Sequence, residues 1–208
     1  MSTENKSFKK LILFIICYIS YVSIYIARLN LTMAAPVFQE MGYLDAAQIG
    51  RMGSIFSVVY AAGRLINGGL ADKVKPWIMI CGGLVICGIA SIFAGFLPPF
   101  MGMLLLWAAN AYSQSMLWSS LLCVISASYD AETARKKVSY LVTTVAVGNI
   151  LGIIVNTFFI NSFGVAFAFV IPGAFCLVCS LFAFQYGQDF SQKGKERTAY
   201  SDVQAVRR

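Results

Sequence analysis

Six long apolar stretches, separated by short polar segments, make up most of the chain. They cover residues 11–36, 48–70, 77–97, 100–127, 138–160 and 166–186. Most are close to or above the ~20 residues that a helix needs to cross the hydrocarbon core of a bilayer. The pattern predicts an all-α membrane protein: a polar segment at 1–10, a six-helix transmembrane bundle at 11–186, and a charged tail at 187–208. The first stretch is too long for a removable signal peptide.

The composition supports a membrane protein. Hydrophobic residues make up 59% of the chain and charged residues 12%, and the mean hydropathy is +0.74. A soluble domain normally carries ~25% charged residues. The composition therefore excludes an ordinary soluble domain and makes the lipid bilayer the first expected partner.

Basic residues are distributed unequally between the two sides of the predicted bundle. Thirteen of the 16 lysines and arginines fall in the N-terminal segment, the tail, or the connections after the second and fourth stretches. The opposite connections contain only Glu40 and Asp45 as charges. The positive-inside rule then places both termini in the cytoplasm of a multi-pass plasma (inner) membrane protein. The net charge of +7 follows from this topology, so we expect no nucleic-acid partner.

The sequence offers no constellation for catalysis. Histidine, the commonest acid–base and metal-binding side chain, does not occur in it. The six cysteines lie within the apolar stretches, and Cys176 and Cys179 resemble a redox pair only in spacing, because no electropositive group lies nearby. We therefore expect neither an enzyme nor a protein with a cofactor or metal.

A polar stripe in the first stretch gives the strongest indication of function. Tyr21, Tyr25, Arg28 and Thr32 recur at spacings that place them on one helix face. Counted at ~1.5 Å per residue, Arg28 lies roughly 6 Å past the midpoint of residues 11–36. An arginine at the bilayer centre costs about 2.5 to 3.5 kcal/mol and normally has a partner. The six stretches contain no acidic residue, so the partner is an anionic substrate, a backbone carbonyl or a group on another segment.

The second stretch carries two more arginines, which we interpret differently. Arg51 lies near the outer end, where a long side chain can reach the interface, and we assign it no function. Arg64 lies roughly 9 Å from its inner end, whereas Arg28 lies about 25 Å from its own. Taken literally, these depths are too different for joint contact with one small anion. Arg64 is therefore either a second cation of the pathway, if the helix ends are misplaced, or an interfacial residue.

Polar and small residues also recur in the fourth and fifth stretches. Asn110, Gln114 and Trp118 share one helix face, and they either line a cavity or join helices by hydrogen bonds. Gly148 and Gly152 form a small-x-x-x-small pattern that predicts close helix packing.

The connection after the second stretch introduces a family resemblance. Residues 68–73 read Gly-Gly-Leu-Ala-Asp-Lys, in which Gly68, Asp72 and Lys73 resemble the signature loop of the major facilitator superfamily. This chain departs from that signature after Lys73.

Three further segments resemble the organophosphate:phosphate antiporters, which include the glycerol-3-phosphate and hexose-phosphate transporters. Residues 28–36 fit Arg-x-Asn-x-x-x-Ala-x-Pro, and residues 60–68 resemble Tyr-x-x-x-Lys/Arg-x-x-x-Gly. Residues 110–118 resemble Asn-Gly-x-x-Gln-x-x-Gly-Trp. The resemblance implies the N-terminal half of a twelve-helix fold, built from two inverted three-helix repeats. It also implies that Arg28 grips phosphate together with an arginine of a C-terminal six-helix half.

The implied activity is exchange of phosphate or organic phosphate anions by alternating access. The substrate-binding set expected from the stripes and the resemblance comprises Arg28, Arg64, Tyr21, Tyr25, Thr32, Asn110, Gln114 and Trp118. Val145 occupies the position of a histidine in the phosphate carriers of the family, which argues against a proton-linked step. Two alternatives stay open: a membrane sensor or receptor for a sugar phosphate, as in one branch of the family, and a non-functional truncated half-transporter.

Overall fold

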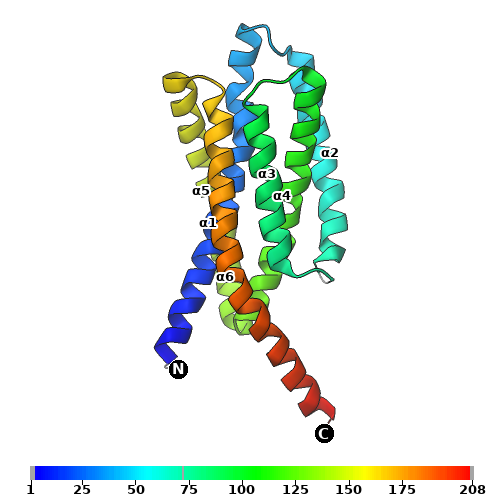
Figure 1. The fold of residues 1–208 in the computed structure, drawn as a ribbon, viewed down its shortest axis with the longest axis vertical. Helices are drawn as coiled ribbons and strands as arrows, with labels where there is room; N and C mark the ends of the chain where they lie inside the picture. The colour runs from blue at the N-terminus through cyan, green and yellow to red at the C-terminus, as the bar shows by residue number, and fades with distance from the viewer. Residues whose placement is uncertain (1–2, 72, 207–208) are drawn as a thin grey trace.

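The computed structural model describes the backbone of residues 3–71 and 73–206, and the side chains of residues 8–71 and 73–187. Six helices run through these residues and pack side by side into one bundle (Figure 1). The six helices expected from the sequence are thus confirmed. They are α1 (Thr3–Glu40), α2 (Ala46–Leu70), α3 (Pro76–Ala94), α4 (Phe100–Ser128), α5 (Ala131–Phe163) and α6 (Phe167–Val206).

Several helices extend beyond the apolar stretches that predicted them. α1 continues past Pro36 to Glu40, and α6 continues through Val206, so a helix occupies most of the tail expected at 187–208. α5 begins at Ala131 rather than at 138, because the Asp130 carboxylate accepts a hydrogen bond from Thr133 N at 3.0 Å and caps the helix. Hydrophobicity locates the lipid-facing part of a helix, whereas the capping residue marks its first turn.

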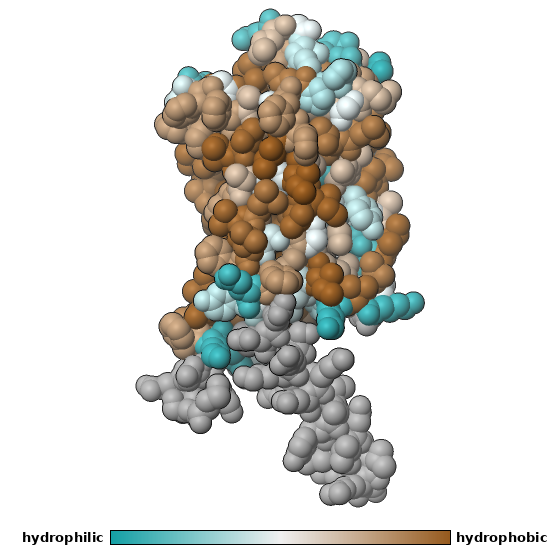
Figure 2. All heavy atoms as spheres, in the orientation of Figure 1, coloured by the Kyte–Doolittle hydropathy of each residue, from teal (hydrophilic) through white to brown (hydrophobic). Residues whose placement is uncertain are grey.

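Four helices, α1, α3, α5 and α6, are long and apolar enough to cross a membrane by length and composition. α2 and α4 have 25 and 29 residues, which is a spanning length, but they carry more polar side chains. Figure 2 shows a broad apolar area across the visible face of the bundle, with hydrophilic residues toward its ends. The start of α1 and the end of α6 lie at the same end of the bundle (Figure 1).

The helix contacts follow an internal two-fold pattern. α1 packs on α5 as α4 packs on α2, and α1 packs on α6 as α4 packs on α3. The central contact joins α3 to α6. Exchange of α1–α3 with α4–α6 therefore maps these main contacts onto one another. Because the exchanged helices run antiparallel (Figure 1), the arrangement is that of two inverted three-helix repeats, as the resemblance implied.

Glycines at the helix crossings show the same symmetry. A Cβ atom at Gly88 would lie 2.7 Å from Gly173 O, and one at Gly173 would lie 2.8 Å from Gly88 O. A Cβ at Gly63 in α2 would lie 2.9 Å from Ser115 Cβ in α4, and one at Gly152 in α5 would lie 3.3 Å from the α1 backbone. The side-chain-free positions let each helix pair approach closely, which confirms the close packing predicted for the fifth stretch.

Two buried asparagines join the same helix pairs as Gly63 and Gly152, and each lies one turn after its glycine. Asn67 Nδ2 donates to Ser115 Oγ at 2.8 Å and joins α2 to α4. Asn156 Nδ2 donates to Ile26 O at 3.0 Å and joins α5 to α1. Ser115 follows Ile26 by the same number of residues as Asn156 follows Asn67. An asparagine thus donates a hydrogen bond to the neighbouring helix at equivalent positions of the two repeats. These two hydrogen bonds hold α2 to α4 and α5 to α1 around the candidate site.

Candidate anion-binding site

Arg28 lies between α1 and α2, half-buried among aromatic rings. Its guanidinium carbon is 4.7 Å from the ring centre of Phe56, 5.0 Å from that of Tyr60 and 5.9 Å from that of Tyr25. The negative faces of aromatic rings attract a guanidinium, and this attraction strengthens as water is excluded. The rings therefore hold the cation inside the bundle without neutralising its charge.

The hydrogen-bonding capacity of Arg28 is unused. Among the described side chains, no carboxylate lies within ion-pair distance of it, and no described residue accepts a hydrogen bond from it. A guanidinium presents five N–H donors in a planar fork that matches a carboxylate or phosphate. The sequence left open whether a backbone carbonyl or another segment of the protein pairs with Arg28. The described part of the chain provides no such partner, so the N–H donors of Arg28 are available to a ligand.

Arg64 approaches the same aromatic group from the next turn of α2. Its guanidinium carbon is 5.8 Å from the ring centre of Tyr60, so both arginines contact one ring. The shared ring agrees with Arg64 as a second cation of the pathway, whereas the exposure of Arg64 agrees with the interfacial alternative. Both side chains reach Tyr60 because an arginine side chain is long enough to extend along the helix axis.

The other members of the predicted stripe on α1 have different surroundings. Tyr21 is buried, with its ring centre 5.3 Å from that of Tyr25 and 5.3 Å from that of Trp118 on α4. Thr32 is exposed and makes no hydrogen bond to the described residues. The structure therefore brings Tyr21, Tyr25 and Trp118 together beside Arg28 and leaves Thr32 outside this group.

Two predicted binding residues on α4 are engaged in hydrogen bonds inside the bundle, one to α3 and one within α4. Asn110 Nδ2 donates to Ser91 Oγ at 3.0 Å, and Gln114 Nε2 donates to Asn110 Oδ1. Both amides are buried. Equal spacing placed Asn110, Gln114 and Trp118 on one face, but the amide of Asn110 is turned to Ser91 of α3, whereas Trp118 lies against Tyr21 of α1. The structure thus favours the interhelical alternative, and we leave both residues out of the proposed ligand contacts.

The remaining predicted positions lie apart from the aromatic group. Lys73 and Arg51 are exposed, and a Cβ atom added at Gly68 would meet nothing within 4 Å. Asp72 lies outside the described residues. Val145, which replaces a histidine of the resembling carriers, packs against the apolar core near the termini.

Sequence reasoning missed Phe56 as part of the site and assigned Tyr60 only to a motif. The two rings are stacked, with centres 6.0 Å apart and planes inclined by 13°. Phe56, Tyr60 and Arg64 are four residues apart and therefore share one face of α2. That spacing could have indicated that Phe56 and Tyr60 belong to the site. Gly148 was noted only for packing, yet a Cβ there would lie 2.5 Å from Tyr25 Cβ.

A family comparison agrees with this arrangement of helices. Residues 15–201 match the model of the Major Facilitator Superfamily. The chain belongs to this superfamily. It is therefore a multi-pass membrane protein, and its six helices correspond to one half of the superfamily fold.

The curated relatives of this superfamily member include transporters and a sensor. A probable hexose phosphate transport protein of Chlamydia trachomatis is 26% identical over 77% of this chain and 35% of that protein. The phosphoglycerate transporter protein of Salmonella typhimurium is 32% identical over 48% of this chain and 21% of that protein. The membrane sensor protein UhpC of Escherichia coli is 26% identical over 51% of this chain and 24% of that protein. The chain spans about a third or less of the length of these relatives.

A solved structure has the same arrangement of helices. It is a bacterial homologue of the human lysosomal transporter Spinster, in an inward-facing and occupied conformation. The TM-score is 0.74 at 19% identity, over 89% of this chain and 45% of that one. At this identity the likeness bears on the fold alone, and the fold agrees.

Proposed function

We propose that this chain is the N-terminal half of a transporter for phosphate or organic phosphate anions, with Arg28 as the main anion-binding residue. The observation that carries the proposal is the Arg28 guanidinium, which Tyr25, Phe56 and Tyr60 hold and to which no side chain of residues 8–71 and 73–187 offers an ion pair or a hydrogen bond. An arginine within a membrane-spanning helix that finds no partner among the described residues is a functional-site hypothesis by default.

The chemistry of the site favours a phosphate ester over a neutral solute. Arginine binds phosphate oxygens through two parallel charge-assisted hydrogen bonds. Arg64, on the same Tyr60 ring, adds a second positive charge for a dianion. Tyr25 and Trp118, which are both partly exposed and flank the buried Tyr21, extend the aromatic surface beside it and offer contact area for an organic moiety. The names of the hexose phosphate and phosphoglycerate transporters support the same substrate class.

The proposed mechanism is alternating access with exchange of one anion for another. A C-terminal six-helix half, in the same or a second chain, closes the site from the other side and contributes a further arginine. The two halves rock about the bound anion near the middle of the membrane. In this proposal the protein lies in the plasma (inner) membrane with both termini in the cytoplasm.

Exchange measured on the reassembled protein tests this function. The chain is reconstituted in liposomes with a C-terminal half of a related transporter, and exchange of labelled phosphate and hexose phosphate is followed. Arg28→Lys keeps the charge but loses the planar fork, so phosphate affinity should fall by about 1.5 to 3 kcal/mol, or roughly 10- to 100-fold.

The matched control is Arg51→Lys, which should leave the affinity unchanged because Arg51 is exposed and lies outside the aromatic group. Unchanged phosphate affinity in Arg28→Lys would remove Arg28 from the site. Robust exchange by the chain without a second half would refute the half-transporter proposal.

A sensor is the second candidate function, and the likeness to the membrane sensor protein UhpC favours it. A sensor needs the same anion site but no completed transport cycle. Saturable binding of a hexose phosphate that depends on Arg28, together with the absence of exchange in the reassembled protein, would select this candidate.

A further inference from the structure

The stripe of α1 that carries Arg28 continues toward the end of the bundle where the termini lie. Steps of three and four residues back from Tyr21 lead to Tyr18 and Phe14, so both share one helix face with Tyr25 and Arg28. The ring centres of Phe14 and Tyr18 are 6.1 Å apart, and both side chains are partly exposed. A row of aromatic side chains therefore extends along α1 from Arg28 to Phe14.

A lysine of α5 lies over the last ring of this row. Lys137 Nζ is 4.3 Å from the ring centre of Phe14 and 5.9 Å from that of Tyr129. Lys137 is half-buried, and none of the described side chains forms an ion pair or a hydrogen bond with its ammonium group. Aromatic rings attract an ammonium group without neutralising it. A positive charge is thus held at the end of the row that is distant from Arg28.

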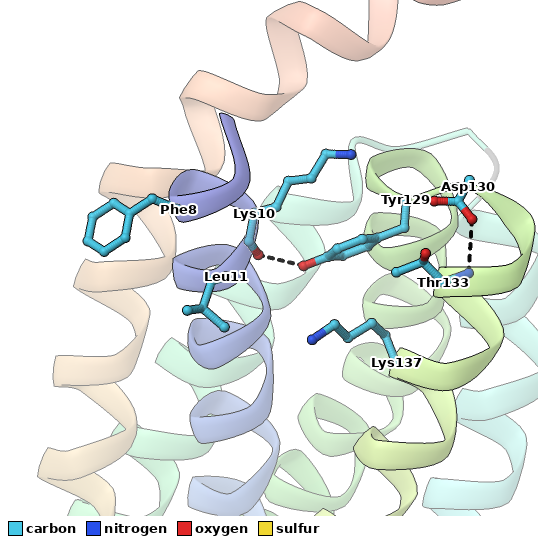
Figure 3. Close-up of a pocket in the computed structure, with 7 residues that line it drawn as sticks. All are labelled: Phe8, Lys10, Leu11, Tyr129, Asp130, Thr133 and Lys137. Carbon is cyan, nitrogen blue, oxygen red and sulfur yellow. Dashed lines mark hydrogen bonds between the residues drawn. The ribbon is translucent and has the colours of Figure 1, made fainter. Parts of the chain in front are cut away.

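Lys137 also lines an open pocket between the start of α1 and the turn from α4 to α5 (Figure 3). The pocket has a volume of about 720 Å³. Lys10 Nζ is 5.4 Å from the Tyr129 ring centre, on the face of the ring opposite to Lys137. Tyr129 Oη donates a hydrogen bond to Lys10 O at 2.5 Å and fixes the ring between the two lysines. The two ammonium groups therefore follow one another from the end of the bundle toward Phe14.

We propose that Lys137 is the entry cation of the anion path, which draws a phosphate or organic phosphate anion from the end of the bundle toward Arg28. This inference rests on the proposed function. Phe14 precedes Arg28 by 14 residues, which is roughly 21 Å along a helix and more than twice the ~8 Å Debye length at physiological ionic strength. Lys137 therefore adds little to the affinity at Arg28. It acts on the approaching anion, because a cleft with one sign of charge accelerates association.

Asp130 lines the same pocket and opposes this attraction. Its carboxylate accepts the hydrogen bond from Thr133 N at 3.0 Å (Figure 3). The negative charge of Asp130 repels an approaching anion, so its removal should speed association. Asn is also a good N-cap residue, and Asp130→Asn therefore removes the charge while it keeps the cap of α5.

Phosphate exchange by the reassembled protein in liposomes, measured at low and at high ionic strength, tests the inference. Lys137→Gln should lower kcat/KM about threefold at low ionic strength and leave kcat unchanged, because the entry cation acts before binding at Arg28. The loss should disappear at about 1 M salt, where the Debye length is about 3 Å. Lys137→Arg keeps the charge and should behave like the unmodified protein. Asp130→Asn should raise kcat/KM about twofold at low ionic strength.

Lys136→Gln is the matched control, because it removes the same charge from the same helix, but Lys136 pairs with Glu132 at 2.8 Å and lies outside the pocket. An equal loss in Lys136→Gln, or a loss in Lys137→Gln that persists at 1 M salt, would overturn the inference. If Lys137→Gln does not fold, as judged by circular dichroism, Asp130→Asn decides: no gain in kcat/KM refutes the entry role.

Arg28→Lys separates this inference from the proposed function. Weakened phosphate affinity in Arg28→Lys together with normal kcat/KM in Lys137→Gln would refute the entry role and leave the proposed function standing. The absence of phosphate exchange by the unmodified reassembled protein would refute both.

Discussion

The contact between Arg28 and Tyr60 can be measured directly by a double-mutant cycle. Arg28→Gln removes the charge at similar length, and Tyr60→Leu removes the ring. The interaction energy is the part of the double variant's destabilisation that the two single variants do not explain. If the ring holds the guanidinium, the change at each position should cost less once the other partner is gone.

The expected size follows from the geometry. A cation over an aromatic ring is worth about 0.5 to 1 kcal/mol at an exposed site and about 2 kcal/mol when desolvated. Arg28 is half-buried and 5.0 Å from the Tyr60 ring centre, with Phe56 sharing the guanidinium at 4.7 Å. We expect a coupling energy of about 1 kcal/mol, which is roughly fivefold in the unfolding equilibrium. Tyr60→Phe keeps the ring and should retain most of it.

Reversible unfolding of the purified chain in mixed micelles, followed by far-ultraviolet circular dichroism, gives the four free energies of unfolding. The control cycle pairs Arg51→Gln with Tyr60→Leu, and its coupling energy should be zero because no contact joins Arg51 to the ring. A coupling energy for Arg28 and Tyr60 within about 0.3 kcal/mol of zero, the usual error of additivity, would refute the aromatic support of Arg28.

Two further predictions concern packing and topology. Gly63→Ala should destabilise the bundle by about 1 to 3 kcal/mol, because the added Cβ would lie 2.9 Å from Ser115 Cβ. The control is Gly53→Ala on the same helix, where the added Cβ meets nothing within 4 Å, and this change should stabilise the bundle by up to about 1 kcal/mol. Equal effects of the two changes in an unfolding titration would contradict the close α2–α4 approach. A cysteine introduced at Ser162, on a background in which the native cysteines are replaced, should react with a membrane-impermeant thiol reagent only from the outside, and labelling from the cytoplasm alone would reverse the proposed orientation.

The bundle itself was predictable from the sequence because the hydrocarbon core imposes one length and one polarity on every span. The helix ends were less predictable, since Asp130 begins α5 by a hydrogen bond that hydropathy does not register. Arg28 could also be singled out, because an arginine in an apolar stretch is expensive wherever the helix points.

The surroundings of Arg28 were not predictable to the same degree. The spacing of Asn110 and Gln114 defined a face of α4, but only the packing of α3 on α4 decided that this face meets Ser91. In the same way, Phe56 looks like any apolar residue of α2 until α1 is placed beside it. Periodicity gives the face of one helix, whereas a site requires knowledge of which helix lies opposite.

The internal symmetry separates the residues that build the bundle from those that the proposed function uses. The contacts of Asn67 and Asn156 recur in the same register in both repeats, so packing alone accounts for them. In that register Leu117 of α4 corresponds to Arg28 of α1. Leu117 is fully buried in the apolar core, which means that the repeat is built without a cation at this position. The scaffold therefore does not require a cation at this position, and in the proposed function the bound anion offsets the cost of Arg28 within an apolar helix.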